Sequence, residues 1–550
     1  MTPTHGWRAV LAENDAVAAA ADRLVVVACF ALIGLLLLIL STYGYGRDQG
    51  IYAVVGDAIT RGGAPYKDAW DFKPPMIFFV YAFSRAALGA EMVAIRIVEV
   101  LSFASLVAAF AVYSRRHIGD WRPGLVGGTL AVLTHVQLEF WHTAQPESFG
   151  AIATAWALVC ATYDPRKSDR HAVRKLGCAW AGAGLLYTVA ALLKPPLGGG
   201  FLVSLGFVLA ARRAPGEERT PARVWLPVLC FGAGAAFVLG AMGLYFLATG
   251  AWDDGVDALF VFAPAYTALY ADLGRLGGFF LRSLQDALVF YSAYIPVGLA
   301  LWVALPPIDS RERRGALHVL GVVSLQLLGV ALQAKFFAYH YAATLALFSL
   351  LAGWGLWKLW LRIHTRFLAA FAVLAALVWL HDLHAARPSY RGSDFPSRAA
   401  LRLKLLTGGG DPALGDRLHS VSDVNAGANR RTAAWLREHV PPEASVFVWG
   451  FEPGLYDLAR RRPASRYIYN LPQRLEWAGS EAARADLLRD LERDPPAAIV
   501  VVSRDFFRNV TGNQEDSRGA LARFPGLRAL IDREYERAAR FEDLEILERR

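Results

Sequence analysis

Long blocks of apolar residues constrain this chain more than any other feature. Hydrophobic residues make up 55% of its 550 residues and charged residues only 19%, whereas soluble domains contain about 25% charged residues. Many of these blocks approach the length of about 20 residues with which a helix crosses the hydrocarbon core of a bilayer. The sequence therefore predicts a polytopic α-helical membrane protein rather than a large soluble core.

We predict about eleven membrane spans, an odd number that places the two termini on opposite sides. The predicted spans are 24–41, 92–113, 125–141, 147–163, 176–193, 197–211, 225–248, 287–305, 316–334, 341–358 and 366–382. The first span is preceded by about twenty residues that include Glu13, Asp15 and Asp22, which is not a signal-peptide pattern. We therefore expect it to remain as an uncleaved helix.

The basic residues between the spans predict the orientation. The loops on one side contain about eighteen Lys and Arg, whereas the short loops on the other contain two, Lys194 and Lys335. Because basic loops stay in the cytoplasm, we expect a cytoplasmic N-terminus and an outward-facing first loop at 42–91. This placement also accounts for the formal charge of +9 without a nucleic-acid partner.

The composition changes after residue 383, where apolar runs shorten and charges become frequent. We predict strands at 446–449, 466–469 and 497–502 and helices at 432–439 and 481–492, a pattern typical of an α/β domain. The expected organisation is a transmembrane module at 1–383 and a soluble extracytoplasmic α/β domain at 384–550, with a boundary near the 388–396 linker.

Two stretches of the outer face carry carboxylates close to membrane spans. The 47–75 segment contains Asp48, Asp71 and Lys73, and Glu147 opens the span at 147–163. A carboxylate at a membrane mouth is a candidate functional group, although Asp48 could be solvated and Glu147 could simply cap its helix. Together they could share a proton role, bind sugar hydroxyls or hold a divalent cation. Asp71 and Lys73 shape a proline-closed turn or face the same site.

The outer cations and aromatics form a second group of candidates. Lys194 lies between two spans and is followed by two prolines, and Lys335 and His340 lie in another tight aromatic turn. Lys194 could extend its ammonium group to the interface or bind a phosphate at the membrane surface. Lys335 and His340 could add to that anion site, while the neighbouring aromatics form an interfacial belt.

The remaining motifs exclude several classes of site. The four cysteines all fall inside apolar blocks without C-x-x-C spacing, which favours packing over disulfides or metal ligation. No Walker loop, dinucleotide fingerprint, zincin motif or nucleophile elbow occurs in a convincing context. The sequence thus predicts no nucleotide cofactor.

The order of these residues resembles the GT-C membrane glycosyltransferases. An acid follows the first span, a G-x-P-Y-x-D-x-x-D-x-K-P-P stretch occupies 63–75, an acid opens the fourth span, and a Lys-containing turn joins the fifth and sixth. The pattern is similar to bacterial relatives of the dolichyl-phosphate-mannose protein mannosyltransferases, which include the lipid A aminoarabinose transferase. The resemblance covers roughly the first 350 residues, and the VWGFEPGLYDLARRRPASRYIY segment is similar to bacterial members.

The resemblance implies an inverting transfer of a sugar from a polyprenyl-phosphate donor to a lipid, glycan or protein acceptor. Asp48 matches the catalytic acid of the first loop. Glu147 matches the second acidic position, which lies near the catalytic acid and, in some members, near a metal. Lys194 matches the lysine that holds the lipid-linked phosphate. The protein mannosyltransferases carry Asp-Glu where this chain has Asp48-Gln49. The implied location is a bacterial inner membrane, with the C-terminal domain in the periplasm.

Two other functions fit the same residues. A transporter or flippase for a polar lipid would also use outer acids and a phosphate-binding lysine, but would need polar residues deep in several spans. A non-catalytic envelope assembly protein would use its outer domain to bind a partner. The concentration of polar residues at one face favours the enzyme.

Overall fold

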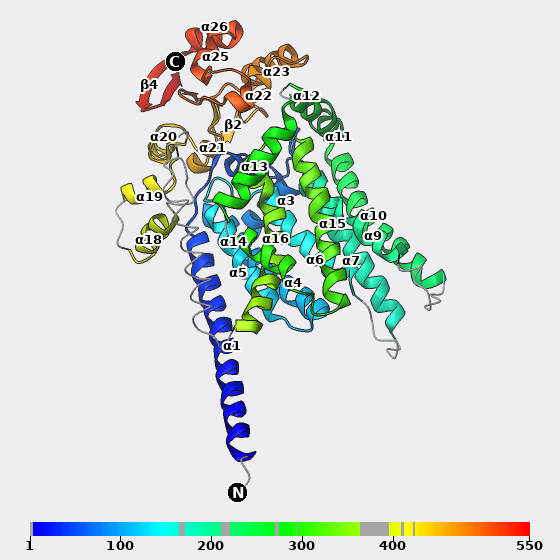
Figure 1. Cartoon of the computed structure of the whole chain (residues 1–550). Coiled ribbons are helices and arrows are strands. Elements are labelled where there is room, and N and C mark those ends of the chain that lie inside the picture. The colour runs from blue at the N-terminus through cyan, green and yellow to red at the C-terminus, as the bar shows by residue number, and fades with distance from the viewer. Residues whose placement is uncertain are drawn as a thin grey trace.

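The computed structural model describes residues 4–163, 171–210, 221–269, 274–292, 294–363, 395–408, 412–421 and 424–550. A helical bundle lies below a smaller domain that contains a sheet, and the chain ends in that domain (Figure 1). The prediction of a multi-span helical membrane protein with a C-terminal α/β domain is confirmed. The predicted span at 366–382 and the boundary at residue 383 lie outside the described residues.

Twelve helices of the described residues form the bundle. They are α1 (Thr4–Leu40), α4 (Met92–Ile118), α5 (Arg122–Gln137), α6 (Pro146–Ala161), α7 (Ala172–Leu193), α8 (Pro195–Gly198), α9 (Gly200–Ala210), α10 (Pro221–Thr249), α13 (Leu276–Phe290), α14 (Tyr294–Ala304), α15 (Ser310–Leu332) and α16 (Ala342–Ile363). Six helices in the described part of the chain are long and apolar enough to cross a membrane. The shorter α5 and α6 are mostly buried by their neighbours.

Glycines bring neighbouring helices of the bundle into close contact. A Cβ on Gly127 of α5 would lie 2.8 Å from the Cα of Leu350 in α16, and one on Gly353 would lie 2.3 Å from the backbone nitrogen of Gly127. Gly184 of α7 approaches the backbone of Phe231 in α10 in the same way. Without a hydrophobic force between helices in lipid, such small residues permit the backbone approach that stabilises the bundle.

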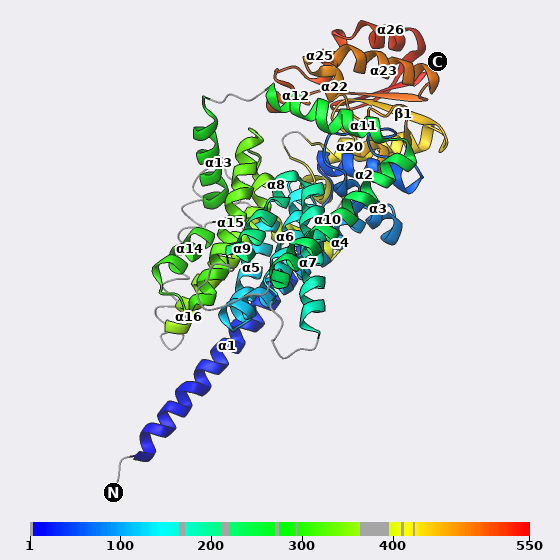
Figure 2. The same ribbon diagram turned by 90° about the vertical axis from the view of Figure 1, so that its right-hand side faces the viewer.

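The outer connections are helical rather than irregular. The first loop contains two helices, α2 (Arg47–Thr60) and α3 (Met76–Leu88). The connection after α10 contains α11 (Trp252–Val256), the π-helix η2 (Asp257–Phe262) and α12 (Ala263–Ala268), and the 3₁₀-helix η3 (Ala338–Tyr341) precedes α16. In the view turned by 90°, the helices α2, α11 and α12 lie between the bundle and the sheet domain (Figure 2).

The C-terminal domain is built around a five-stranded mixed sheet of order β2-β1-β3-β5-β4. Its strands are β1 (Ser445–Trp449), β2 (Arg462–Pro463), β3 (Ala498–Val502), β4 (Tyr535–Phe541) and β5 (Leu544–Arg549). Its helices are α18 (Phe395–Leu406), α19 (Pro412–Leu418), α20 (Ala426–His439), α21 (Gly454–Ala459), α22 (Leu471–Arg474), α23 (Ser480–Arg493), α24 (Arg508–Thr511), α25 (Ser517–Ala522) and α26 (Pro525–Glu534). The first three strands pair in parallel, and β5 pairs antiparallel with both β3 and β4.

One predicted strand is wrong. Residues 466–469 form no strand, because this segment binds the first outer loop instead of the sheet. The backbone nitrogen of Trp70 donates to the carbonyl of Arg466 at 2.7 Å, and the Tyr469 hydroxyl donates to Asp71. This segment therefore joins the soluble domain to the first outer loop.

Candidate active site

Asp48 lies in the first turn of α2, immediately after the first membrane helix. The helix begins after Gly46, whose backbone nitrogen donates to the Gln49 side chain at 2.9 Å. A helix N-terminus favours a negative charge, and the Gln145 amide donates to Asp48 Oδ2 at 3.2 Å. The Asp48 side chain remains 26% exposed. It is therefore a carboxylate that a ligand can reach.

Lys73 joins Asp48 to a buried carboxylate in the same loop. Its Nζ lies 3.3 Å from Asp48 Oδ1 and 3.6 Å from Asp71 Oδ2. Burial opposes the charge of Lys73, but the negative charges of Asp48 and Asp71 outweigh it and raise the pKa of the ammonium group. Burial raises the pKa of Asp71, while Lys73 and the Tyr469 hydroxyl, 2.7 Å away, favour the ionised form. Lys73 therefore stays protonated and provides a positive charge beside Asp48.

Glu147 and Lys194 form a second pair at the same membrane face. Glu147 follows Pro146 in the first turn of α6, and Lys194 separates α7 from α8 with an extended backbone. The Lys194 ammonium group donates to Glu147 Oε1. Burial lowers the pKa of Lys194, and the Glu147 carboxylate acts against that change. Within the described residues Glu147 Oε2 has no hydrogen-bond partner.

The aromatic turn before α16, at residues 335–341, completes the candidate site next to Lys194 and Asp48. The Tyr339 ring lies 5.8 Å from Lys194 Nζ, and its hydroxyl interacts with Asp48. His340 contacts the Lys335 carbonyl oxygen through Nδ1 at 2.6 Å. Lys335 Nζ lies 3.1 Å from the centre of the Tyr266 ring. Burial lowers the pKa of Lys335 to about 7.

The structure brings together all seven residues that the sequence singled out. They are Asp48, Asp71, Lys73, Glu147, Lys194, Lys335 and His340, which come from five separate segments of the chain. Electrostatic interactions connect Lys73 with both Glu147 and Lys335, so the three lysines and three carboxylates form one charged centre. The predicted topology accounts for their shared membrane face, because every one of them lies on a predicted outer loop or turn.

Sequence reasoning missed the neutral partners of these charges. Gln145 contacts Asp48, and Tyr52 donates to Gln145 Oε1 at 2.9 Å. Tyr469 reaches Asp71 from the soluble domain. Amides and phenols in loops are common surface residues, so their identity carried no signal. The closeness of Gln145 to Glu147 in the chain was the one indication in the sequence.

A divalent cation fits this arrangement poorly. The described residues contain no group of three or more His, Cys, Asp and Glu side chains arranged to hold a metal ion. Asp48 is paired with Lys73 and Glu147 with Lys194. A cation at the predicted Asp48 and Glu147 position would therefore face two ammonium charges.

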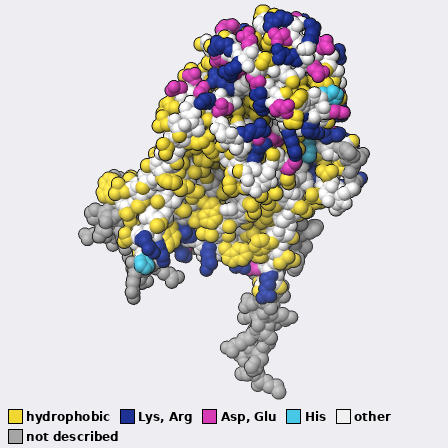
Figure 3. Space-filling model, turned by 180° about the vertical axis from the view of Figure 1, so that it is seen from behind, with side chains coloured by type: hydrophobic (Ala, Val, Ile, Leu, Met, Phe, Trp, Pro, Cys, Tyr) yellow, Lys and Arg dark blue, Asp and Glu magenta, His cyan; other side chains and the backbone are white. Residues whose placement is uncertain are grey.

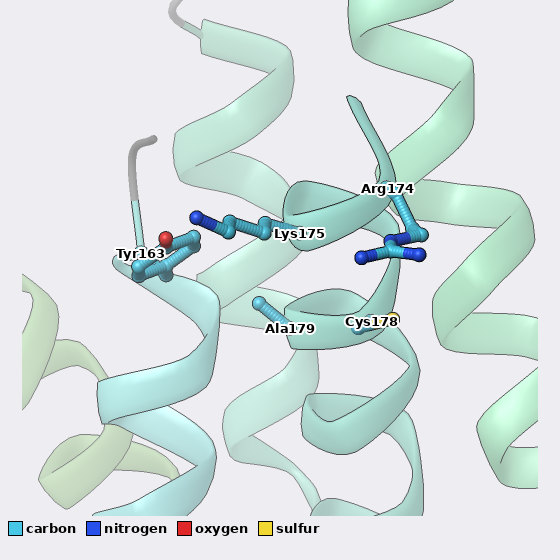
Figure 4. A pocket seen from close by; sticks show the side chains of 5 residues that line it. All are labelled: Tyr163, Arg174, Lys175, Cys178 and Ala179. Carbon is cyan, nitrogen blue, oxygen red and sulfur yellow. The ribbon is translucent and has the colours of Figure 1, made fainter. Parts of the chain in front are cut away.

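A separate open cavity of about 530 Å³ lies beside the beginning of α7 (Figure 4). It is lined by Tyr163, Arg174, Lys175, Cys178 and Ala179. Tyr163 follows α6 at the end opposite to Glu147, so this cavity is separate from the charged centre.

Comparison with solved structures identifies the architecture. The crystal structure of ArnT from Cupriavidus metallidurans bound to undecaprenyl phosphate is 15% identical, with a TM-score of 0.60 over 95% of this chain and 97% of that chain. The apo structure of the same protein gives 15% identity and a TM-score of 0.61 over 96% and 98%. This chain has the fold of ArnT. No protein-family model and no curated protein matches it.

The ArnT fold accounts for the whole chain and not only for its bundle. Coverage of 95–96% of the chain includes both the bundle and the C-terminal sheet domain. The expected GT-C architecture is therefore confirmed. The Archaeoglobus fulgidus oligosaccharyltransferase complex with Zn and sulfate is 14% identical over 86% of this chain and 67% of that chain, with a TM-score of 0.45.

Proposed function

We propose that this protein is an inverting glycosyltransferase, which moves a sugar from a polyprenyl-phosphate donor to an acceptor hydroxyl on the extracytoplasmic side. One observation carries the proposal: a reachable carboxylate, Asp48, is flanked by Lys73 and Lys194 at the mouth of an ArnT-like bundle. The ArnT structure with the same fold was solved with undecaprenyl phosphate. Such a lipid needs its phosphate site at a membrane surface, where the lysines lie.

The distribution of surface charge supports an extracytoplasmic site. On the face seen from behind, an apolar band crosses the bundle, and mixed charges cover the soluble domain (Figure 3). The opposite rim carries mainly Lys and Arg (Figure 3). Basic residues concentrate on the cytoplasmic side of membrane proteins. The charged centre and the soluble domain would then face the periplasm of a bacterial inner membrane.

Asp48 is the best candidate for the general base. Asp71 and Glu147 are 0% and 1% exposed, and each faces a lysine. Asp48 combines a lysine partner with an exposed edge, so an acceptor hydroxyl can approach it. Removal of the hydroxyl proton by a positioned carboxylate contributes about 10²–10⁴-fold to rate.

The lysines suit the departing phosphate. The acceptor oxygen forms a bond to the anomeric carbon of the sugar as the bond from that carbon to the phosphate oxygen breaks. The proton of the hydroxyl passes to Asp48, and the bonding electrons leave with the phosphate. Lys194 and Lys73 stabilise the charge that develops on this group. Attack opposite to the phosphate inverts the anomeric configuration.

The first test compares envelope glycans in cells that carry no protein, the wild-type protein or Asp48→Asn. Mass spectrometry of lipid, polysaccharide and protein fractions detects the added mass of any sugar. We expect one sugar modification to depend on the wild-type protein and to fall by at least about 100-fold with Asp48→Asn. Asp253→Asn, which changes an exposed outer carboxylate, is the control. A normal level of the modification with Asp48→Asn would contradict the base assignment.

The second test measures binding of undecaprenyl phosphate to the purified protein. Lys194→Gln should weaken binding by about 10–100-fold, because a charge-assisted contact to phosphate is lost. Lys67→Gln is a matched control, since Lys67 is exposed on the same face and donates to the Thr249 carbonyl at 2.9 Å. Equal affinities for the two variants would contradict the phosphate site.

A further inference from the structure

Two charged residues are fully buried beneath the charged centre, inside a membrane-spanning helix. Arg96 and Glu99 of α4 are both 0% exposed, and Arg96 Nη1 lies 2.7 Å from Glu99 Oε2. The proposed transfer uses neither residue directly. Because a buried ion pair in a membrane segment is costly, its presence indicates a role beyond filling space.

The pair is bonded to the loop that leads to Glu147. Arg96 donates to the Thr143 hydroxyl at 2.9 Å and to the Phe140 carbonyl at 3.1 Å. Glu99 Oε1 accepts from the backbone nitrogen of Ala144 and contacts His135 Nε2 at 2.8 Å. The 138–145 loop is therefore hydrogen-bonded to both Arg96 and Glu99.

The backbone of this loop needs such support. Glu139 and Ala144 adopt positive φ angles of 66° and 52°, which are unfavourable for residues with a Cβ. Arg398 and Arg402 of α18 hold the Glu139 carboxylate at 2.9 and 2.8 Å. One end of the loop is thus fixed by α18, and the other by Glu99.

The same loop holds Asp48. Gln145 donates to Asp48 at 3.2 Å, and the Gln49 amide donates to the Phe140 and Thr143 carbonyls at 3.2 and 2.5 Å. Arg96 also donates to the Gly44 carbonyl at 2.6 Å, just before α2. Any movement of the loop would change the position of Asp48 relative to Glu147.

We propose that Arg96 and Glu99 are positioning residues, which fix the 138–145 loop so that Asp48 and Glu147 keep their separation. This inference rests on the proposed function. Arg96 and Glu99 are both 0% exposed, so a bound substrate would not reach them, and their loss should act on transfer rather than on binding of the lipid phosphate at Lys194.

The test compares Glu99→Gln with Glu312→Gln, a matched control. Glu312 is 1% exposed and pairs with Lys358 at 2.8 Å, and its other side-chain contacts are to Trp302 and the Ile308 backbone. Three quantities are measured for each variant: thermal stability, affinity for undecaprenyl phosphate, and the rate at which the envelope modification appears per folded protein. Both variants should lose stability, because each unpairs a buried cation.

We expect Glu99→Gln alone to slow the modification, by about 10–100-fold, with affinity for undecaprenyl phosphate within about twofold of wild type. Thr143→Val removes one Arg96 contact at nearly constant volume and should slow the modification by a smaller factor. This variant replaces Glu99→Gln in the test if Glu99→Gln does not fold. Equal rates for Glu99→Gln and Glu312→Gln, or a wild-type rate for a folded Thr143→Val, would overturn the inference. A wild-type protein that binds the lipid phosphate but modifies nothing would overturn the proposed function and this inference with it.

Discussion

At the scale of single residues, Gln49 shows why an amide follows Asp48. The Gln49 side chain is fully buried, and its Nε2 faces the carbonyl oxygens of Phe140, Trp141 and Thr143 at 3.2, 3.3 and 2.5 Å. A carboxylate at this position could donate to none of them. The Asp-Glu pair of the mannosyltransferases that this chain resembles is therefore incompatible with the surroundings of residue 49 here.

The first prediction concerns Gln49→Glu. It places a negative charge against three carbonyl oxygens, so it should lower the free energy of unfolding by about 2–4 kcal/mol and abolish most activity. Thermal unfolding of purified protein and the level of the envelope modification measure the two effects. Gln514→Glu, at an exposed position, should change neither. A stable and active Gln49→Glu protein would show that the loop can rearrange around a carboxylate.

The second prediction concerns Lys335, whose pKa burial lowers to about 7. The ammonium form predominates below that pH, so Lys335 should aid binding of undecaprenyl phosphate there and lose its effect above it. The ligand gains negative charge through about pH 6, which acts in the opposite direction. Affinity should therefore decline between about pH 7 and pH 8.5.

Titration of undecaprenyl phosphate against variants at several pH values checks this expectation. Lys335→Met should remove the decline above about pH 7. Lys67→Met, which alters an exposed lysine of the same face, should retain it. An unchanged pH profile for Lys335→Met would show that Lys335 lies outside the phosphate site.

At the scale of elements, the contact between α2 and α21 fixes Asp48 to the soluble domain. A Cβ on Gly50 would lie 2.7 Å from the backbone nitrogen of Gly454 and 2.9 Å from its Cα. Neither backbone atom can move without moving α21. A Cβ on Gly454 would meet only the Cα of Gly50, at an ordinary 3.8 Å. The two glycines share one contact but differ in the space around them.

The third prediction follows from this asymmetry. Gly50→Ala should push α2 away from α21 and displace Asp48, which lies two residues earlier, so that the envelope modification slows by about tenfold or more. Gly454→Ala should leave the rate near that of wild type. Measurement of both rates per folded protein separates the effect from changes in expression. Equal rates for the two variants would mean that α2 and α21 do not need this close approach.

Elements also show how far the sequence could predict the fold. Hydropathy predicted most of the long helices of the bundle, because about 20 consecutive apolar residues are typical of a membrane span. The predicted span at 287–305 is wrong, because α13 ends at Phe290 and a separate helix, α14, begins at Tyr294.

In the C-terminal domain, the helices predicted at 432–439 and 481–492 correspond to α20 and α23, although α20 begins earlier, at Ala426. The hairpin of β4 and β5 was missed, because its sequences YERAARF and LEILER are rich in charges and contain a single β-branched residue, whereas strands are recognised by β-branched and aromatic runs. The 466–469 segment was misassigned because its aromatic residues pack on Trp70 and bind Asp71, contacts between distant parts of the chain.

The candidate active site was likewise predicted only in part from the sequence. Positive-inside topology predicts that Asp48, Glu147 and Lys194 share one face, and the structure places them together. It does not predict that Lys73 joins Asp48 to Asp71, or that Tyr469 reaches Asp71 from the soluble domain. The Lys73 contacts depend on how the first outer loop folds, and the Tyr469 contact depends on the docking of the soluble domain. A single sequence contains no pattern for either.

At the scale of the whole molecule, a buried carboxylate connects the soluble domain to the first turn of α2. Glu452 accepts from Arg47 Nη2 at 2.9 Å and from Asn429 Nδ2 at 2.7 Å. Burial raises the pKa of Glu452 to about 7, although Arg47 and Asn429 act in the opposite direction. Asp505 and Asp543 of the same domain also have pKa values raised by burial. The domain therefore contains several groups that burial favours in the protonated form.

The last prediction is the sign of the pH dependence of stability. A carboxylate with a raised folded-state pKa binds more protons in the folded state than in the unfolded state, where Glu titrates near 4.3. Its stabilising effect is complete below that unfolded value and declines as pH rises through about 7. The protein should thus unfold at a lower temperature at pH 7.5 than at about pH 5.5. Glu452→Gln should flatten this dependence, because an amide does not titrate, whereas Glu443→Gln, at an exposed position, should preserve it. A pH dependence that Glu452→Gln leaves unchanged would show that Arg47 holds Glu452 ionised, because a group ionised in both states contributes no slope. The soluble domain would then be held to α2 by an ion pair at every pH in the range.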